Sequence, residues 1–420
     1  MELLLIGAGV QGTPYVSAAR RLGARVRLVE TERQLTRLAG EVDEAIITPG
    51  ETDEDWAAAA CAAAVRRRPD GVLGFNEPQV LAAALVQDEL GLPGPGLRAA
   101  VISRNKGLQR GRFRAAGVPQ PEHLLVDDLA AARGWALARL PVVVKPLSLA
   151  GSAGVVQVAD PAGYDRLAVA RAGQRLLVEE QVTGPEYSWE GLVRDGTVLF
   201  GNVTEKETLG PPGFVEVGHR AGYRFAPEPQ AAVDAMVRSV LAAMGVGSGI
   251  VHLELVLTGT GPVLIEIAVR TPGDYLMDVV SLTTGVDLYD AVLRIALGLP
   301  LEDPLGPPAP VAYAASWMVT ADPGRIVEVS GLDEVRRQPH VARARLRRSL
   351  GDVVAPVRSS ADRIGHVLVS APTPAERDAA LEFARRHLRV TTQPQSTDGD
   401  TGGRGPAEAA RRPVRGRGGV

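Results

Sequence analysis

Residues 142–154 have the sequence Val-Val-Val-Lys-Pro-Leu-Ser-Leu-Ala-Gly-Ser-Ala-Gly. The three valines predict a short buried strand that ends at Lys145 and Pro146. Small residues and glycines follow from Ser148 to Gly154, and a loop of this kind can turn its backbone amides toward phosphates. The segment therefore predicts a strand that leads into a phosphate-covering loop, with an ammonium group at the junction.

The next segments offer what a nucleotide needs beyond its phosphates. Residues 176–182, Leu-Leu-Val-Glu-Glu-Gln-Val, predict a strand that runs into polar residues, and Gly184 and Glu186 come shortly after. An adenine needs a backbone donor and acceptor beside an apolar wall, and a ribose needs a carboxylate. We expect this segment to supply both.

Two later strands carry a pair of carboxylates. Residues 251–255, Val-His-Leu-Glu-Leu, alternate in polarity, so His252 and Glu254 point to one face, and Glu266 lies on the partner strand. A five-residue loop would place the two glutamates opposite each other, and a four-residue loop would place them one position apart. Such close carboxylates repel without a cation, and oxygen-only ligation favours Mg²⁺. Arg270 follows, where its guanidinium can hold a carboxylate or phosphate.

Lysine is rare in this chain, because only three of the 46 basic residues are lysines. They are Lys106, Lys145 and Lys206, and all three lie in the region with the nucleotide features. An ammonium is a compact point charge that differs chemically from a guanidinium. These three positions are therefore candidate functional residues, with the role of Lys206 left open.

The beginning of the chain carries a competing signal. Residues 7–12, Gly-Ala-Gly-Val-Gln-Gly, lie between a predicted strand and helix, and Glu30 ends the next predicted strand. This is the pattern of a dinucleotide-binding βαβ unit, and it makes an NAD-dependent oxidoreductase an alternative. The same turn also occurs in doubly wound domains that bind no dinucleotide. Strands and helices alternate over residues 1–95, which predicts a parallel, doubly wound unit.

Taken together, these motifs resemble the ATP-grasp ligases. The resemblance rests on Arg-Asn-Lys at 104–106, Val-Val-Val-Lys-Pro before the glycine loop, Val-Glu-Glu-Gln-Val-x-Gly-x-Glu-Tyr, His-Leu-Glu-Leu and Ile-Glu-Ile-x-x-Arg. It implies a multidomain chain of α/β and α+β parts: an N-terminal doubly wound pre-ATP-grasp domain at 1–95 and an ATP-grasp domain at 96–305. The ATP lid within it would cover about 120–185. A small α+β domain at 306–390 and a disordered tail at 391–420 would follow.

The resemblance also implies roles for individual residues. Lys106 and Lys145 would contact ATP phosphates, and Arg270 would stabilise the acyl phosphate or tetrahedral species. Glu254 and Glu266 would hold Mg²⁺. The remaining ATP-binding residues would be Ser148, Gly151, Ser152 and Gly154 over the phosphates, Glu180 and Val182 at the adenine, Glu186 at the ribose, and Glu179 elsewhere in the nucleotide site.

Three positions bear on the substrate and the metal. Glu77 follows a strand of the first unit, at the edge where open α/β sheets bind ligands, and can pair with a substrate ammonium or simply begin a helix. His219 lies in a segment, Glu-Val-Gly-His, that resembles one facing phosphates or substrate in amino-acid ligases. Ala268 stands where many family members have a metal-binding Asn, which puts the coordination of a second metal in question.

Composition excludes several classes of protein. The 420 residues are 45% hydrophobic with a net charge of −3, which argues against disorder and against broad attraction to nucleic acid or membrane. The single cysteine and the absence of a leader pattern predict a cytoplasmic location. We expect an ATP-dependent carboxylate–amine ligase that uses ATP, Mg²⁺ and small-molecule substrates, with a homodimer possible. A purine-pathway ATP-grasp carboxylase or ligase and a non-catalytic nucleotide-binding protein are further alternatives.

Overall fold

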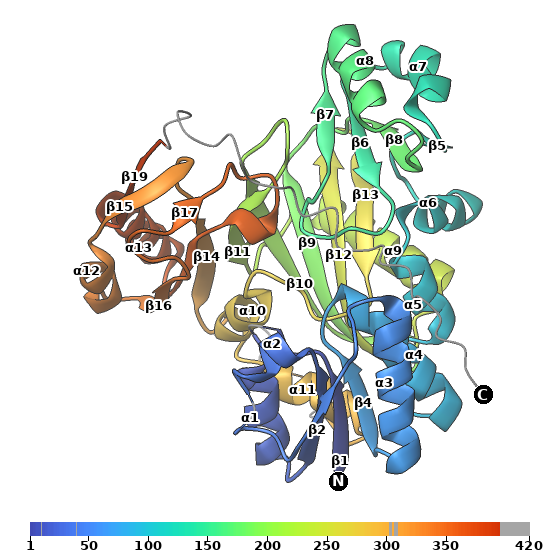
Figure 1. The fold of residues 1–420 in the computed structure, drawn as a ribbon, viewed down its shortest axis with the longest axis vertical. Coiled ribbons are helices and arrows are strands. Elements are labelled where there is room, and N and C mark those ends of the chain that lie inside the picture. Colours follow the sequence, from blue (N-terminus) through green and yellow to red (C-terminus); the bar gives the residue numbers. More distant parts are fainter. Residues whose placement is uncertain (10, 39, 302–304, 306–309, 395–420) are drawn as a thin grey trace, which may run out of the picture.

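The computed structural model describes residues 1–9, 11–38, 40–301, 305 and 310–394. Over this part of the chain the strands form four sheets. In Figure 1 the N-terminal sheet lies at the bottom, a smaller sheet with two helices lies at the top, and the C-terminal elements lie to the left. None of the helices in the described residues is long and apolar enough to cross a membrane.

The N-terminal unit is a parallel sheet of order β3-β2-β1-β4 with helices on both faces, as predicted. Leu3 and Leu5 pack toward α1 and α11, whereas Leu4 and Ile6 pack toward α3 and α4, as the two-residue period of a strand requires. The elements of this unit are β1 (Glu2–Ile6), α1 (Thr13–Arg21), β2 (Arg25–Glu30), α2 (Glu32–Leu35), β3 (Glu44–Ile47), α3 (Asp53–Arg66), β4 (Gly71–Gly74) and α4 (Glu77–Leu90), with α11 (Leu288–Ala296) added from later in the chain.

Local sequence sets the ends of these helices. Thr52 and Asp55 form a capping box at the start of α3, and Gly91 ends α4 in the left-handed conformation that glycine adopts most readily. Asn105 caps α6 by accepting a hydrogen bond from the amide of Leu108. This cap places Lys106 at the first turn of α6.

A second, antiparallel sheet of order β5-β8-β6-β7 forms the top of Figure 1, together with α7 and α8. The strand predicted from the valine run is confirmed as β6, and Val142 and Val144 are fully buried. The elements of this region are α5 (Leu97–Ser103), α6 (Lys106–Ala115), β5 (His123–Val126), α7 (Leu129–Leu137), β6 (Val142–Pro146), β7 (Val156–Val158), α8 (Pro161–Ala170) and β8 (Leu176–Glu180).

The largest sheet has the order β13-β12-β9-β10-β11-β14-β18-β16, and all of its pairs are antiparallel. It runs without a break across the boundary predicted near residue 305, because β11 pairs with β14. Its elements and helices are β9 (Glu186–Arg194), β10 (Thr197–Thr208), β11 (Glu216–Ala221), α9 (Pro227–Met244), β12 (Gly249–Thr258), β13 (Gly261–Ala268), α10 (Leu276–Thr284), β14 (Tyr313–Val319), β16 (Val341–Leu346) and β18 (Gly365–Ala371).

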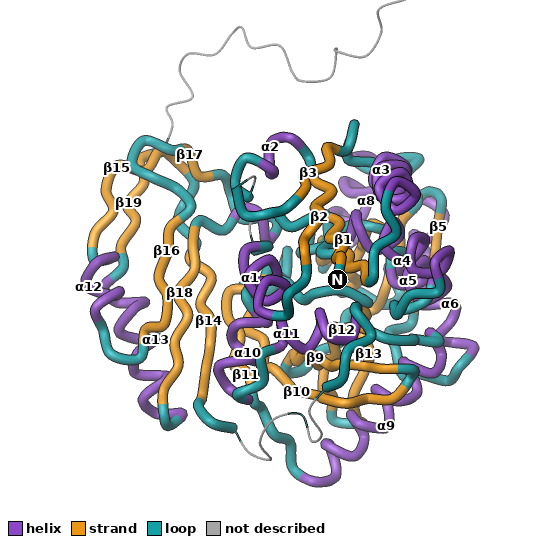
Figure 2. The backbone as a smooth tube through the Cα atoms, turned by 90° about the horizontal axis from the view of Figure 1, so that it is seen from below, coloured by secondary structure: helices purple, strands orange, loops and turns teal. Residues whose placement is uncertain are grey.

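The C-terminal elements complete the left side of the molecule, where Figure 2 shows β14, β18 and β16 side by side. A three-stranded sheet of order β17-β15-β19 packs nearby, and its elements are β15 (Gly324–Ser330), α12 (Leu332–Arg337), β17 (Val353–Val354), the 3₁₀ turn η1 (Ser360–Asp362), α13 (Pro374–His387) and β19 (Arg389–Gln393). The disordered tail predicted from 391 was placed too early, because β19 continues to Gln393, where its pairing with β15 satisfies the backbone. Residues 395–420 lie outside the described residues.

Candidate active site

An open cleft lies between the β5-β8-β6-β7 sheet and strands β9 to β13 of the large sheet. Most of the residues predicted for the site line it. These are Lys106, Lys145, Gly151, Ser152, Glu179, Glu180, Val182, Glu186, Glu254, Glu266 and Arg270. Ser148, Gly154, Glu77 and His219 are not among the lining residues.

Lys145 ends β6 and points its ammonium at Glu179 on the neighbouring strand β8, 2.7 Å away. Glu179 is almost fully buried and also contacts Arg110. Burial raises the pKa of Glu179, but Arg110 and Lys145 outweigh burial and lower this pKa to about 2. Glu179 is therefore a carboxylate that is charged at neutral pH and holds Lys145 in place, while Lys145 itself lines the cleft.

Lys106 connects the glycine loop to β13. Its ammonium donates a hydrogen bond to the carbonyl oxygen of Leu149 at 2.7 Å and another to Glu266 at 2.9 Å. The side chain is only 10% exposed. A helix residue distant in sequence from both partners therefore sets the position of the loop over the cleft.

Part of the cleft lining is apolar. Val143, Val182, Val256 and Ile265 line the cleft together with Glu180, and an apolar wall is one of the features that a nucleobase needs. Glu186 also lines this cleft. Burial raises the pKa of Glu186 above its usual value, even though Lys206 draws this pKa down.

Glu254 and Glu266 are direct partners across β12 and β13, and a bulge follows Glu254. The register that places them opposite each other is the correct one of the two predicted. Ala268, at the position where many family members have a metal-binding Asn, pairs with His252. Its side chain has no oxygen, so it cannot be a metal ligand.

This donor set fits Mg²⁺, which is commonly held by one or two carboxylates while phosphate oxygens and waters complete its shell. Within the described residues no group of three or more His, Cys, Asp or Glu side chains is placed to hold a metal ion. Most ligands of a cation bound here would therefore come from a nucleotide and from water.

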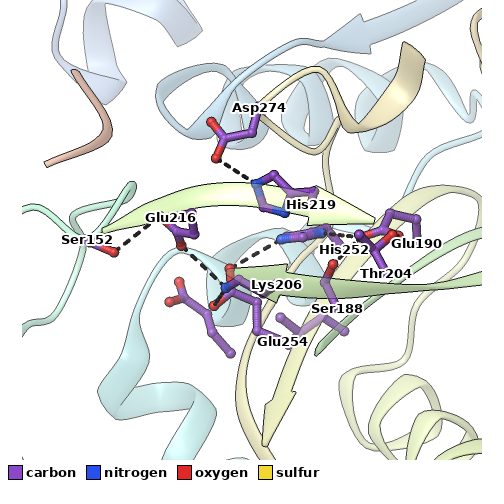
Figure 3. A network of polar contacts seen from close by, with 12 residues as sticks. Ser152, Ser188, Glu190, Thr204, Lys206, Glu216, His219, His252, Glu254 and Asp274 are labelled. Carbon is purple, nitrogen blue, oxygen red and sulfur yellow. Dashed lines mark hydrogen bonds and ion pairs between the residues drawn. The ribbon is translucent and has the colours of Figure 1, made fainter. Parts of the chain in front are cut away.

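Figure 3 shows that Lys206 and His252 converge on Glu254. The Lys206 ammonium lies 3.0 Å from one oxygen of Glu254 and 3.3 Å from Glu216, and the His252 ring contacts the other Glu254 oxygen at 3.3 Å. The second ring nitrogen of His252 contacts the buried Glu190 at 3.2 Å. Glu190 in turn accepts hydrogen bonds from three hydroxyl and amide groups, those of Ser188, Asn202 and Thr204.

These contacts fix the charges of the network. Burial lowers the pKa of His252, but Glu190 and Glu254 outweigh burial and raise this pKa to about 9, so the ring is cationic at neutral pH. Burial likewise opposes the charge on Lys206, but Glu254 and Glu216 hold its pKa well above its usual value. Glu254 is correspondingly held in the charged form, because Lys206 and His252 overcome burial and keep its pKa well below its usual range.

Arg270 lines the cleft and donates a hydrogen bond from Nε to Glu77 at 2.7 Å. Glu77, at the start of α4, is also contacted by Arg104 at 3.3 Å. Burial raises the pKa of Glu77, but Arg270 outweighs burial and holds it below its usual value. Glu77 thus does not line the cleft itself and is linked to it by its contact with Arg270.

His219 lies behind the cleft wall, and its ring contacts Asp274 at 3.1 Å. Asp274 also accepts hydrogen bonds from Arg363 of the C-terminal region. Burial raises the pKa of Asp274, but Arg363 and His219 outweigh it and hold this pKa well below its usual value. The three residues tie β11, the start of α10 and the C-terminal region together.

In the N-terminal glycine motif, a carboxylate of the chain itself contacts the backbone amides. The Glu30 carboxylate accepts hydrogen bonds from the amides of Ala8 at 2.8 Å and Gly9 at 3.2 Å. Side chains of Phe75 and Gln79 lie against Gly9 and Gly7. The amides that would face a pyrophosphate therefore face a carboxylate of the chain itself, which argues against the NAD alternative. Val10 of this motif lies outside the described residues.

Sequence reasoning missed Glu190 and Ser360, and it noted the segment that begins at Glu216 without giving Glu216 a role. Glu216 accepts hydrogen bonds from the hydroxyls of Ser152 at 3.5 Å and Ser360 at 3.2 Å, and the Ser360 amide bonds to the Gly151 carbonyl at 2.9 Å. The glycine loop is thus held from the C-terminal region. No local sequence pattern marks these contacts of Ser360, since Glu216 and Gly151 are both more than 140 residues away.

Comparison with protein families gives a consistent result along the chain. Residues 138–278 match the family model of the ATP-grasp domain, residues 16–94 match that of the ATP-grasp N-terminal domain, and residues 317–393 match L-amino acid ligase C-terminal domain 2. The chain belongs to the ATP-grasp family and has the ATP-grasp fold.

Individual relatives agree with this assignment. The chain is 28% identical to an uncharacterized protein of Sinorhizobium fredii over 73% of this chain and 64% of that protein, and 30% identical to human carnosine synthase 1 over 71% and 40%. It therefore spans less than two thirds of either relative. The crystal structure of L-amino acid ligase from Bacillus licheniformis shares the fold, with a TM-score of 0.79, 24% identity, and coverage of 93% of this chain and 98% of that one.

Proposed function

We propose that this chain is an ATP-dependent ligase that joins a carboxylate to an amine, and that an amino acid is one of its substrates. The observation that carries the proposal is the convergence of three lysines, Arg270 and two opposed carboxylates on one cleft. The substrates together bring several negative charges to one place, and a cluster of fixed cations stabilises them. The names of the relatives, carnosine synthase and L-amino acid ligase, support the same reaction class.

The reaction has two balanced steps. A carboxylate oxygen of the first substrate attacks the γ-phosphorus of ATP, the bond to the β–γ bridging oxygen breaks, and an acyl phosphate and ADP result. The amine of the second substrate then attacks the acyl carbon, inorganic phosphate leaves, and the amine loses a proton. An acyl phosphate hydrolyses in water, so the cleft must stay closed during both steps.

The residues of the cleft suit these tasks. Lys106, Lys145 and Lys206 would hold the phosphates, and the glycine loop from Ser148 to Gly154 would cover them. Glu254 and Glu266 would hold Mg²⁺, which when bound neutralises phosphate charge. Arg270 would stabilise the negative charge that develops on the transferring group.

The Arg270 and Glu77 pair supports an amino acid as substrate. An α-amino acid carries a carboxylate and an ammonium. Arg270, which lines the cleft, would pair with the carboxylate, and the charge of Glu77, 2.7 Å from Arg270 and outside the lining, would favour the ammonium nearby. The identity of the amino acid depends on contacts that these charged groups do not define.

The test is product formation from a panel of amino acids with ATP and Mg²⁺, followed as ADP, phosphate and product mass. Glu266→Gln removes one charge from the opposed carboxylates and is expected to lower ADP formation by about 100-fold or more. The matched control is Glu328→Gln, an exposed strand glutamate on β15, which should leave the rate unchanged. Full turnover by Glu266→Gln would contradict the metal assignment.

Ala268 favours a second candidate, a nucleotide-binding protein without turnover, because it removes a ligand oxygen from the cleft. That candidate predicts ATP binding with no ADP from any substrate pair. A purine-pathway type of ATP-grasp enzyme instead predicts ADP formation with a purine precursor and none with amino acids. The same panel, extended by such precursors, separates the three outcomes.

A further inference from the structure

Each of the two opposed carboxylates has its own lysine. Lys206 lies 3.0 Å from Glu254, and Lys106 lies 2.9 Å from Glu266. The lysine side chains are 3% and 10% exposed, whereas both carboxylates are 25% exposed toward the cleft. The more deeply buried ammonium groups thus neutralise carboxylates that are more exposed to the cleft, and Figure 3 shows the contact of Lys206 with Glu254.

Of the two carboxylates, Glu254 has both of its oxygens in contact with basic side chains. One of its oxygens contacts Lys206 and the other contacts His252. A dication placed against these oxygens would lie within a few ångströms of an ammonium, where like charges repel strongly in a partly buried site. The carboxylates are therefore poor ligands for a free divalent cation as long as the lysines stay in place.

Nucleotide phosphates can relieve this block. Lys206 and Lys106 both line the cleft, and Lys106 also holds the glycine loop through the Leu149 carbonyl. Phosphate oxygens compete well with a carboxylate for an ammonium, because the negative charge of a triphosphate is higher. A lysine that moves from its glutamate to a phosphate leaves the glutamate oxygens free for a divalent cation. The negative charge of the phosphates then balances the lysine, and the cation balances the glutamate.

We propose that Lys206 and Lys106 are resident counter-ions of Glu254 and Glu266, and that they withhold these carboxylates from a divalent cation until nucleotide phosphates draw the ammonium groups away. This inference rests on the proposed function for the identity of the nucleotide. It gives Lys206, whose role the sequence left open, a task distinct from phosphate binding alone. It also predicts that nucleotide and metal enter together and that the metal does not bind first.

The third lysine of the cleft offers a matched control. Lys145 also pairs with a glutamate, at 2.7 Å, but that partner is Glu179, which Arg110 also neutralises. Glu179 is 1% exposed, and it does not belong to the opposed pair. Removing the Lys145 charge therefore leaves Glu254 and Glu266 with their lysines.

The experiment measures Mn²⁺ binding to the 420-residue chain without nucleotide, by electron paramagnetic resonance of free Mn²⁺. The wild-type chain should bind Mn²⁺ weakly, Lys206→Met should bind it about tenfold more tightly or better, and Lys145→Met should match the wild type. Lys206→Arg, which retains the charge, should also match the wild type. Equal Mn²⁺ affinity of wild type and a folded Lys206→Met would overturn the proposal, as would a similar gain in Lys145→Met.

A second variant, and a comparison of Mn²⁺ binding with ligase activity, ensure that the proposal can be tested in every case. If Lys206→Met does not fold, Lys106→Met tests the same exchange at Glu266, with the same two outcomes. Because the assay needs no turnover, a chain that makes no amide can still show the exchange. An active ligase whose wild-type chain binds Mn²⁺ tightly by itself would overturn this inference and leave the proposed function intact.

Discussion

The two glycine-rich loops of this chain, at residues 7–12 and 148–154, are similar in composition and opposite in surroundings. The amides of the first loop donate to Glu30, and Phe75 and Gln79 cover its glycines. The second loop borders a cleft, where Lys106 holds it and Lys145 stands at its base. One loop is filled by the chain, and the other faces space that a ligand can occupy.

The difference shows what a glycine motif specifies. Glycines permit a tight turn and a close approach of the backbone, and in both loops something does approach closely. Whether this is a phosphate or a side chain of the protein depends on the charge placed nearby. A carboxylate at the first loop repels a pyrophosphate, whereas ammonium groups at the second attract one.

The largest expected effect comes from removing the Glu30 carboxylate from the first loop. Glu30 is 3% exposed and accepts hydrogen bonds from the amides of Ala8, Gly9 and Thr31. Glu30→Ala leaves these buried donors without partners and should lower the free energy of unfolding by about 3 kcal/mol. Urea unfolding followed by circular dichroism measures it, with the exposed Glu32→Ala as control. A loss no larger than that of the control would mean that Glu30 does not stabilise the loop.

A somewhat smaller effect on thermal stability should show which of the two loops binds a nucleotide. ATP with Mg²⁺ at about 100 times its dissociation constant should stabilise the chain by about 2.7 kcal/mol and raise its thermal midpoint by several degrees. NAD or NADH should leave the midpoint unchanged, because Glu30 occupies the amides of the first loop. A rise with NAD(H) and none with ATP would reverse the assignment of the two loops.

How far the sequence predicts the site depends on how many strands an interaction crosses. Glu254 and Glu266 were predictable, because alternation and one short turn limit the register to two choices. The bulge after Glu254, which selects between them, has no clear signature in the sequence.

The contact of Lys206 with Glu254 was not predictable in the same way. It depends on β10 and β12 both pairing with β9, an order that only the assembled sheet defines. The His252 and Glu190 contact joins residues 62 positions apart for the same reason. Ser360 reaches the glycine loop from the C-terminal region, so its role emerges only from the packing of distant segments.

The smallest expected effects compare one glycine in each loop. Gly7 and Gly154 have φ angles of +69° and +71°, and an added Cβ would lie 2.6 Å from Gln79 and 2.8 Å from Pro146, respectively. Alanine is strained at such angles, so Gly7→Ala should lower the free energy of unfolding by about 1–2 kcal/mol. Because the first loop holds no nucleotide, the KM for ATP should not change.

Gly154→Ala should show the reverse pattern. The glycine loop borders the cleft and none of its residues from Ser148 to Gly154 is buried, so strain there should cost about 1 kcal/mol or less of global stability. A misplaced loop covers the phosphates less well, so the KM for ATP should rise and more ADP should form without amide, as water reaches the acyl phosphate. Steady-state ADP and amide measurements on both variants decide the comparison. If Gly7→Ala changed the KM for ATP and Gly154→Ala did not, the nucleotide would belong to the first loop.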